Sequence, residues 1–367
     1  MQSKTIVSSK GNCQEALSEV FAQLGTDPIG IIFCCEYDWL EDVSSSLKSR
    51  YPSAQIIGTS GIFYSNADVH DNKGLMVVAI TGEAAVEAGV IKHLSTVPLS
   101  DIWNLEQSVS RISPSSDNTI CFEFCTNDEE VMVSTVNMVL SKKNVALIGG
   151  SVFGTPEGEK SLVSVNGKTY GNACSYMLIK NLNGKVHTYR ENIYAPAGGP
   201  AHTATKVNLR NKELIELDHR SAVDVYSQET GLDRSRIVDN VLQQPLGRLV
   251  GDEDVFISSM YAIGAGGSLI NYKRINLNDT MYILKLQDYK EINRETVAKI
   301  RSDVRSPKLI LSVNCIYRYI LFDQEGYLKT FLGDVMGSLG SFPGYIGGGE
   351  QYRHQHVNQT MVCAVFD

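Results

Sequence analysis

The sequence predicts an α/β protein with α+β character, in which duplicated strand–helix–strand units form mixed sheets covered by helices. Two observations predict this class. Short apolar runs, typical of strands buried on both faces, alternate with segments whose apolar residues recur every three or four positions, as on one face of a helix. The same order of elements then repeats, because similar glycine turns at Gly58 and Gly149 lie 91 residues apart. We therefore expect a duplicated α/β unit.

The first unit shows these signals in order. Residues 4–8 form a short strand, after which Asn12 caps a helix with Glu15 three residues later, as in a capping box. Gly25 ends this helix. Strands and helices at this spacing predict a sheet with helical cover. The later elements of the unit are strands at residues 30–35, 55–58 and 75–80 and a helix at residues 41–50.

Two further copies follow the same order, the third more weakly than the second. In the second copy, the apolar residues of the helix recur at helical spacing, and strands flank it. We expect its strands at residues 120–122, 147–152 and 175–179, with a helix carrying Met132, Val136, Val139 and Leu140. In the third copy we expect strands at residues 309–315 and 360–366, a helix at residues 327–336 and a glycine segment at residues 344–350. Outside the copies we expect helices at residues 220–230 and 291–304 and a strand at residues 279–286.

The length suggests about two domains. A segment rich in proline and glycine at residues 195–201 disfavours both a helix and a central strand, and it is the clearest linker. We therefore expect one domain at residues 1–197 and a second at residues 198–367.

Composition and charge exclude several classes of protein. The chain has 33 Lys and Arg against 41 Asp and Glu, a formal charge of −8, without a basic run of the kind that nucleic-acid binding requires. Its longest apolar stretches, such as residues 75–80, are far shorter than a membrane span, and the N-terminus lacks the apolar region of a secretory signal. The eight cysteines lie mostly in apolar runs without zinc-ligand spacing, so we expect buried free thiols. A cytoplasmic protein without a metal site is the expectation.

Phosphate-binding and catalytic motifs are absent. The glycines at residues 264–267 and 347–349 lack the spacing of a nucleotide-binding loop and are more typical of turns. Ser60 and Ser151 do not stand in a nucleophile elbow, although hydroxyls at strand ends can bind a small ligand. We expect no enzyme. The alternative is an enzyme that uses Cys315 or a serine of the glycine loops.

The densest polar cluster precedes the last strand. It includes Glu350, Gln351, Tyr352, His354, His356, Asn358 and Gln359. Strand alternation places Tyr352, His354 and His356 on one side. Either the segment is a solvated hairpin, or it is a binding wall in which Glu350 takes an ammonium group or an arginine and Asn358 fixes polar edges. His354 and His356 are then the candidates for ligating haem iron, although two histidines are not a complete metal site.

A second polar group follows the strand at residues 309–315. Asn314 and Cys315 end this strand, and Arg318 brings a cation to the same end. If the third copy pairs its strands as the others do, Arg318 and Glu350 approach each other. That pair is either a structural salt bridge or the two ends of a site for an amino-acid-like ligand.

At these residues the sequence resembles the FIST family of sensory modules, with an N-terminal and a C-terminal FIST part that together cover essentially the whole chain. The carriers are residues 33–38, 57–61, 148–151 and 314–318, and the most specific pair is residues 342–352 with residues 356–360. Within them Cys315-Ile316-Tyr317-Arg318 keeps one family pattern, and in the next Tyr345 takes the aromatic position and Gly349-Glu350 forms the end.

The resemblance implies a small-molecule sensor. Family members occur fused to chemoreceptor, histidine kinase and cyclic-di-nucleotide output domains, and a subset of stand-alone members binds haem b and senses nitric oxide. Both halves of this chain are accounted for, which favours the stand-alone type acting on a separate histidine kinase or cyclic-di-nucleotide enzyme. The expected ligand is an amino acid or similar molecule, or haem with nitric oxide. A scaffold without a ligand pocket is a further alternative. The expected ligand-binding residues are Ser60, Ser151, Asn314, Cys315, Arg318, Glu350, Gln351, Tyr352, His356 and Asn358.

Overall fold

The computed structural model describes residues 1–25, 27–115, 117–250 and 254–367, and these fall into two compact units. The first unit holds residues 1–190, 293–355 and 361–367. The second holds residues 191–292 and 356–360. The boundaries between these compact units therefore do not fall at residue 198. The boundary between FIST domains at residues 197 and 198 stays a prediction, and part of the expected linker forms strand β14 (Tyr194–Pro196).

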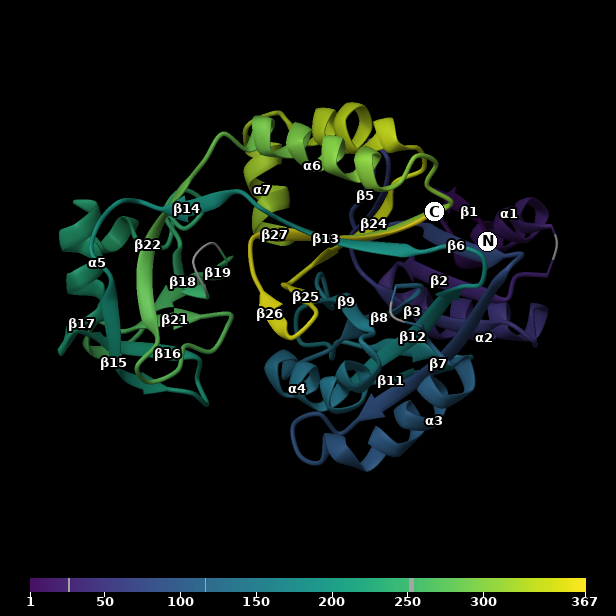
Figure 1. Ribbon diagram of the computed structural model, residues 1–367, viewed down its shortest axis with the longest axis horizontal. Helices are drawn as coiled ribbons and strands as arrows, with labels where there is room; N and C mark the ends of the chain where they lie inside the picture. The colour runs from purple at the N-terminus through teal and green to yellow at the C-terminus, as the bar shows by residue number, and fades with distance from the viewer. Residues whose placement is uncertain (26, 116, 251–253) are drawn as a thin grey trace. The chain divides into compact units, whose positions relative to one another are not determined.

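Three copies of one motif build the first unit (Figure 1). Each copy contributes a first strand, a helix, a central strand, a second helix, a strand parallel to the central one, a hairpin and a last strand. The main strands of the first copy are β1 (Gln2–Ser8), β2 (Gly30–Cys35), β3 (Gln55–Ser60) and β6 (Leu75–Thr81). Those of the second are β7 (Ala84–Lys92), β8 (Thr119–Cys125), β9 (Ala146–Ser151) and β12 (Ala173–Asn181). Those of the third are β13 (Val186–Asn192), β23 (Leu309–Cys315), β24 (Pro343–Gly347) and β27 (Thr360–Phe366).

The three sheets share one strand order. In sequence labels it is β1-β6-β2-β3, β7-β12-β8-β9 and β13-β27-β23-β24. In each sheet the two central strands run parallel, with Cys35 beside Ser60, Cys125 beside Ser151 and Cys315 beside Gly347. The last strand pairs antiparallel with the central strand. This common register confirms the predicted mixed sheets and the repeat around Gly58 and Gly149.

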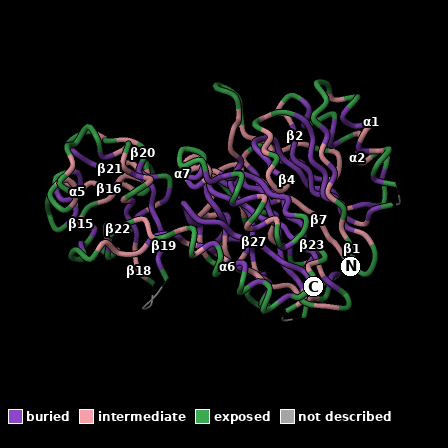
Figure 2. Tube along the Cα trace, turned by 90° about the horizontal axis from the view of Figure 1, so that it is seen from above, coloured by how far each residue is buried: buried purple, intermediate pink, exposed green. Residues whose placement is uncertain are grey.

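Helices cover the outer face of each sheet, and the inner faces meet in a common core (Figures 1 and 2). Helices α1 (Cys13–Leu24) and α2 (Leu40–Arg50) pack on the first sheet, and α3 (Ile102–Ile112) and α4 (Glu129–Leu140) pack on the second. Helices α6 (Tyr289–Asp303) and α7 (Ile316–Gln324) belong to the third copy. Side chains from all three sheets, among them Ile32, Phe122 and Leu311, form the central apolar core. The predicted helix cap is also confirmed, because Asn12 Oδ1 accepts a hydrogen bond from Glu15 N at 2.9 Å.

Each copy donates its hairpin to the sheet of another copy. The hairpin β4 (Phe63–Ser65) and β5 (Asp68–His70) pairs with β24 of the third copy. The hairpin β10 (Val163–Val165) and β11 (Lys168–Tyr170) pairs with β3 of the first copy. Strand β25 (Glu350–Tyr352) pairs with β9 of the second copy. The exchange is therefore cyclic, and it binds segments far apart in sequence into one unit.

Equivalent turn residues fix the three exchanged hairpins. Asn66, Asn166 and Arg353 have φ angles of 50°, 49° and 53°. Their backbone N–H groups donate to Phe342 O at 3.0 Å, Ile56 O at 2.9 Å and Leu147 O at 2.7 Å, respectively. This shared geometry shows that the three hairpins dock on their neighbouring copies in the same way.

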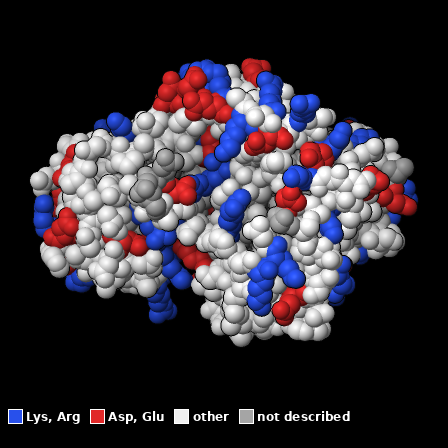
Figure 3. All heavy atoms as spheres, viewed as in Figure 1, with Lys and Arg blue, Asp and Glu red and all other residues white. Residues whose placement is uncertain are grey.

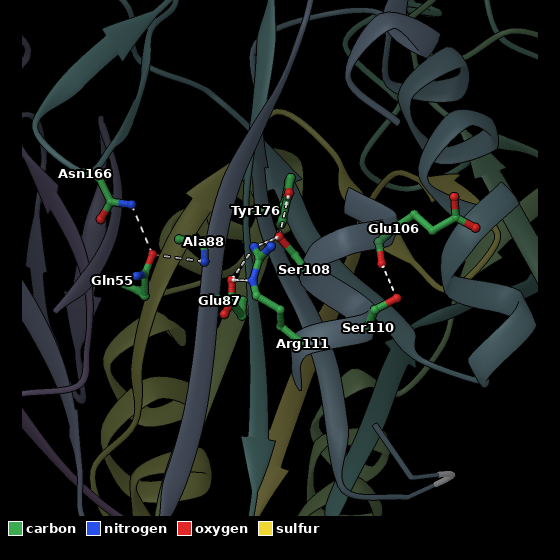
Figure 4. A network of polar contacts seen from close by, with 9 residues as sticks. All are labelled: Gln55, Glu87, Ala88, Glu106, Ser108, Ser110, Arg111, Asn166 and Tyr176. Atoms are coloured by element: carbon green, nitrogen blue, oxygen red, sulfur yellow. Dashed lines mark hydrogen bonds and ion pairs between the residues drawn. The ribbon is translucent and has the colours of Figure 1, made fainter. Parts of the chain in front are cut away.

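The Asn166 side chain also joins a polar network around the edge strand β7. Gln55 Oε1 accepts hydrogen bonds from Asn166 Nδ2 at 3.1 Å and from Ala88 N at 3.3 Å (Figure 4). Arg111 Nη2 pairs with Glu87 Oε2 at 2.8 Å in the same view. The backbone of β7 is thus held both to the first copy and to α3.

The third copy is helical over most of the expected residues 327–336, but as π-helical and 3₁₀ turns, and a helix that the sequence did not predict precedes them. Helix α7 starts directly after β23, and a π-helical turn (Thr330–Val335) and a 3₁₀ turn (Met336–Leu339) follow. The apolar residues of this region, Phe322, Phe331 and Leu332, are all buried. Their spacing therefore reflects packing of two short helical segments rather than one long helix.

Over its described residues, the second unit consists of a nine-stranded sheet, one α-helix and short 3₁₀ turns. Its strand order is β19-β18-β22-β15-β16-β21-β20, with β14 beside β22 and β17 beside β16. Helix α5 (Ala222–Thr230) lies within the expected helix at residues 220–230 and ends at Gly231 in the left-handed conformation. The strands are β15 (His202–Asn208), β16 (Glu213–Leu217), β17 (Arg220–Ser221), β18 (Leu246–Val250), β19 (Asp254–Ser258), β20 (Met260–Ile263), β21 (Leu269–Asn271) and β22 (Thr280–Leu286).

The cysteines follow the expectation from the sequence. All eight cysteines are free thiols, and all but Cys13 are buried. In the part of the chain that the structure describes, no helix is long and apolar enough to cross a membrane. On the face in Figure 3, basic side chains alternate with acidic ones and do not form a continuous basic band.

Candidate functional site

A buried arginine stands at the start of α7. Arg318 lies in the first turn of the helix, directly after β23 ends at Cys315, and its side chain is 0% exposed. The guanidinium carbon lies 4.7 Å from the ring centroid of Phe322 and 5.1 Å from that of Phe331. Two aromatic faces thus orient a permanent cation inside the protein. We call Arg318 with Tyr64, Ser312, Asn314 and Glu350 the Arg318 cluster; each of these side chains is at most 1% exposed.

A chain of hydroxyl groups crosses two copies within this cluster. Ser312 Oγ donates to Pro343 O at 2.8 Å, so Tyr64 OH donates to Ser312 Oγ, also at 2.8 Å. Tyr64 comes from the hairpin that the first copy donates to the third sheet. Gly344 makes room for the ring, since a Cβ there would lie 2.2 Å from Tyr64 Cζ. The exchanged hairpin therefore supplies one polar group of the cluster.

Asn314 is the unusual member of the cluster. Its side chain is 0% exposed, and neither Oδ1 nor Nδ2 has a hydrogen-bond partner among the described residues. Leu311 and Val313 point into the central core, so Ser312 and Asn314 point to the opposite, helix-covered face of β23. A buried amide without partners costs about 1–3 kcal/mol. The protein carries this cost unless a polar partner enters the site.

Glu350 adds a carboxyl group to the cluster. It starts β25, and its side chain is 0% exposed. Burial raises the pKa of Tyr64 above its ordinary value, the hydrogen bond to Ser312 and the charge of Arg318 lower it, and the charge of Glu350 raises it. Because the charges of Arg318 and Glu350 both act on the same phenol, the two charged groups lie in one region of the first unit.

The glycine segment before Glu350 is anchored on Ser151. Ser151 N donates to Gly349 O at 2.9 Å, and Gly348 N donates to Ser151 O at 3.1 Å. Gln351 Nε2 donates to Ser151 Oγ at 3.2 Å, and Tyr345 OH donates to Ser151 O at 3.3 Å. Ser151 and Gln351 thus hold the segment that carries Glu350. The serine hydroxyl is engaged within the protein.

Three other expected site residues lie at separate places in the first unit. Ser60 ends β3 and is 1% exposed, and Cys315 at 1% exposure is the residue before α7. Among the described hydrogen bonds, none joins Ser60 to the Arg318 cluster. Tyr352 is half-buried, and its hydroxyl donates to Thr188 O at 3.2 Å. Tyr352 is therefore held against β13.

The histidine segment differs from the expected alternation. Arg353 and His354 form an exposed turn between β25 and β26 (Gln355–Val357), so Tyr352, His354 and His356 do not share one side of a strand. The positive φ angle of Arg353 reverses the chain at this point. The predicted alternation is wrong because it ignored a two-residue hairpin turn.

His356 and Asn358 belong to the second unit. There His356 is 3% exposed, and Asn358 Oδ1 accepts a hydrogen bond from Ser259 N at 3.4 Å. Neighbouring Gln359 Nε2 donates to Ser259 Oγ at 2.8 Å. Asn358 and Gln359 thus hydrogen-bond to Ser259 within the second unit.

His354, one of the two candidate haem ligands, lies at the surface of the protein. His354 is exposed on a turn, whereas an axial haem ligand is enclosed by the walls of its pocket. Across the described residues, no group of three or more His, Cys, Asp or Glu side chains has the arrangement of a metal site. The exposed position of His354 does not suit an axial ligand of haem iron.

Sequence reasoning missed Tyr64, Ser312 and the two phenylalanines at Arg318. Tyr64 and Ser312 lie 248 residues apart, and no local pattern joins them. One signal was available for the hairpin that carries Tyr64. Asn66 and Asn166-Gly167 each stand between short runs of strand-forming residues, as in a tight hairpin turn.

The structure is thus an α/β protein of three related copies whose first unit encloses an arginine, a carboxyl group and an unpaired amide. The model of the FIST N domain matches residues 28–220, more than half of the chain. The chain therefore belongs to the FIST family, whose domains sense small ligands. No curated protein matches the chain.

Proposed function

We propose that this protein is a sensor that binds a small polar ligand at the Arg318 cluster and signals through a separate partner protein, such as a histidine kinase or a cyclic-di-nucleotide enzyme. The observation that carries the proposal is the unpaired amide of Asn314, which is fully buried at the end of β23, four residues before the buried Arg318. A ligand that hydrogen-bonds to this amide would remove its desolvation cost.

The chemistry of the cluster favours a ligand with an acidic group. Arg318 presents a guanidinium to a carboxylate, and Glu350 suits an ammonium group. An amino acid or a similar zwitterion carries both groups. The amide of Asn314 can donate to one ligand atom and accept from another.

Thermal unfolding of the purified protein with a panel of amino acids and related metabolites tests the proposal. A ligand of the folded state raises the melting temperature by mass action. We expect Asn314→Leu to abolish the ligand response and to leave the free protein as stable as the original or more so, because it removes an unpaired buried amide.

Asn181→Leu is the matched control. Asn181 is also 0% exposed, but its Nδ2 donates to Asp367 O at 2.9 Å. This control should lower the melting temperature and keep the ligand response. Loss of stability in Asn314→Leu together with an intact response would show that the amide is structural and would contradict the proposal.

The second FIST domain at residues 198–367, a cytoplasmic location and the haem and nitric oxide version belong to the same proposal in finer form. Protein produced with iron and a haem precursor should show a Soret band if the haem version holds, and His356→Ala and His354→Ala then test the axial ligand. Colourless protein that takes up no added hemin would remove this version and leave the Arg318 cluster untouched. The enzyme alternative has little support, because the thiol of Cys315 is 1% exposed and could reach a substrate only after local opening of the fold.

A further inference from the structure

Two cysteines of the second copy face each other across neighbouring strands. Cys125 is the last residue of β8, Cys174 is the second residue of β12, and the antiparallel register places them directly opposite. Both side chains belong to the apolar core under α3 and α4, so both point to the same face of the sheet. In the first copy the equivalent pair is Cys35 and Leu75. The second copy therefore carries a thiol where the first carries a leucine.

The hydrogen-bond pattern brings the two cysteine side chains as close as a sheet allows. Thr126 N donates to Ala173 O at 3.0 Å, so Thr126 and Ala173 form a hydrogen-bonded pair. Because hydrogen-bonded and non-hydrogen-bonded pairs alternate along two antiparallel strands, the adjacent pair, Cys125 and Cys174, is a non-hydrogen-bonded one. Cys125 O accepts from Val152 N at 2.8 Å and so points to β9, away from β12. Such non-hydrogen-bonded pairs have Cα atoms roughly 4.5 Å apart. This value falls within the roughly 4.4–6.8 Å that a disulfide spans.

Each thiol of the reduced protein has its own acceptor. Cys125 Sγ donates to Asn127 O at 3.1 Å, and Cys174 Sγ donates to Glu123 Oε2 at 3.4 Å. Burial raises the pKa of both thiols. Reaction of either thiol therefore requires local opening of this part of the sheet.

We propose that Cys125 and Cys174 are a reversible oxidation site that closes to a cross-strand disulfide. The oxidant is a low-molecular-weight disulfide such as oxidised glutathione. Cys125 attacks it to form a mixed disulfide and releases one thiol; Cys174 then attacks Cys125 Sγ and releases the second. Two electrons pass from the protein to the oxidant, and the two cysteine protons end on the two released thiols.

Oxidation alters the packing beside α4. The disulfide removes both S–H donors, so Asn127 O and Glu123 Oε2 lose these contacts. Glu123 is 0% exposed, and its Oε1 already lacks a hydrogen-bond partner among the described residues. The loop that leads into α4 and the carboxyl group of Glu123 therefore differ between the two redox states.

Peptide mapping under non-reducing conditions tests the site. The folded full-length protein is incubated with oxidised glutathione, free thiols are blocked, and the digest is analysed by mass spectrometry. We expect a linked peptide pair containing Cys125 and Cys174, lighter by two hydrogen atoms, which dithiothreitol separates. Cys174→Ser should abolish the linked pair.

Cys121→Ser is the matched control, because Cys121 lies on the same face of β8 but opposite Leu178. It should leave the link intact. The wild-type map decides the question even if a variant fails to fold. Glutathione adducts without the Cys125–Cys174 link, or a link between other cysteines in its place, would overturn the proposal.

Discussion

The carboxyl group of Glu123 occupies the space that a side chain at position 149 would need. A Cβ built on Gly149 would lie 2.2 Å from Glu123 Oε1 and 2.4 Å from Glu123 O. The two residues stand side by side in the parallel pair of β8 and β9. In the first copy, Gly58 stands in the same way beside the ring of Phe33. The repeated glycine thus makes room for a large neighbour in each of the two copies.

Gly149→Ala should therefore destabilise the protein by about 3 kcal/mol, the upper range for overpacking a core. Because one of the clashing atoms is a backbone carbonyl, shortening residue 123 should not rescue it. Gly58→Ala meets ring atoms of Phe33 at 2.3–2.4 Å, so Phe33→Leu should recover part of its loss. Urea unfolding of the single and double variants measures both effects. Gly11→Ala is the control, since nothing lies within 4 Å of its Cβ position; equal losses in all three would refute this account.

Glu123 should make the stability of the protein depend on pH. Burial raises the pKa of its carboxyl group well above the ordinary value, while the hydrogen bond from Cys174 lowers it. Above about pH 4.3, the unfolded chain loses a proton that the folded protein keeps. The free energy of unfolding then falls as pH rises, by at most about 1.4 kcal/mol per pH unit, until the pKa of the folded state is reached.

Glu123→Gln removes this titration. The stability of the variant relative to the original should rise between pH 5 and pH 8, which urea unfolding at several pH values measures. Other titrating groups are the same in both proteins and cancel in the difference. Parallel pH profiles would show that Glu123 ionises normally in the folded state.

The parts of the fold that the sequence predicts are those with local signals. Asn12 and Glu15 predict a helix start because the capping contact spans three residues, and the run at residues 30–35 predicts a strand because burial on both faces requires continuous apolar side chains. The repeat at Gly58 and Gly149 can be seen in the sequence because a large residue of the same copy leaves no space for a side chain at either position.

The cyclic exchange of hairpins has no such signal. Tyr64 reaches Ser312 because its hairpin joins a sheet whose other strands come from the opposite end of the chain. Arg318 and Asn314 could be named from their position at a strand end, but the burial of Arg318 between two aromatic rings depends on how the segment after α7 folds back. The composition of the candidate site was thus partly predictable, and its enclosure was not.

The turn residues of the exchanged hairpins offer a stabilising change. Asn66 and Asn166 occupy the left-handed region that asparagine tolerates well, whereas Arg353 occupies it in the third hairpin at some cost. Arg353→Asn should therefore stabilise the protein by about 0.5–1 kcal/mol. Asn166→Ala should cost about 2–3 kcal/mol, because it removes bonds to Ile56 N at 2.9 Å and Gln55 Oε1 at 3.1 Å as well as the turn preference. Thermal unfolding measures both, and destabilisation by Arg353→Asn would contradict the equivalence of the three turns.

The hydroxyl chain from Tyr64 through Ser312 to Pro343 O predicts unequal costs for its two hydroxyl groups. Tyr64→Phe removes a donor and leaves Ser312 bonded to the carbonyl, so we expect a loss of about 1 kcal/mol. Ser312→Ala leaves both the buried phenol and Pro343 O without this partner, so we expect a loss of about 2 kcal/mol or more. In the double variant the phenol is absent as well, and the combined loss should be smaller than the sum of the single losses by about 1 kcal/mol. Urea unfolding of the four proteins in this cycle measures the coupling, and additive losses would show that the two hydroxyl groups act independently.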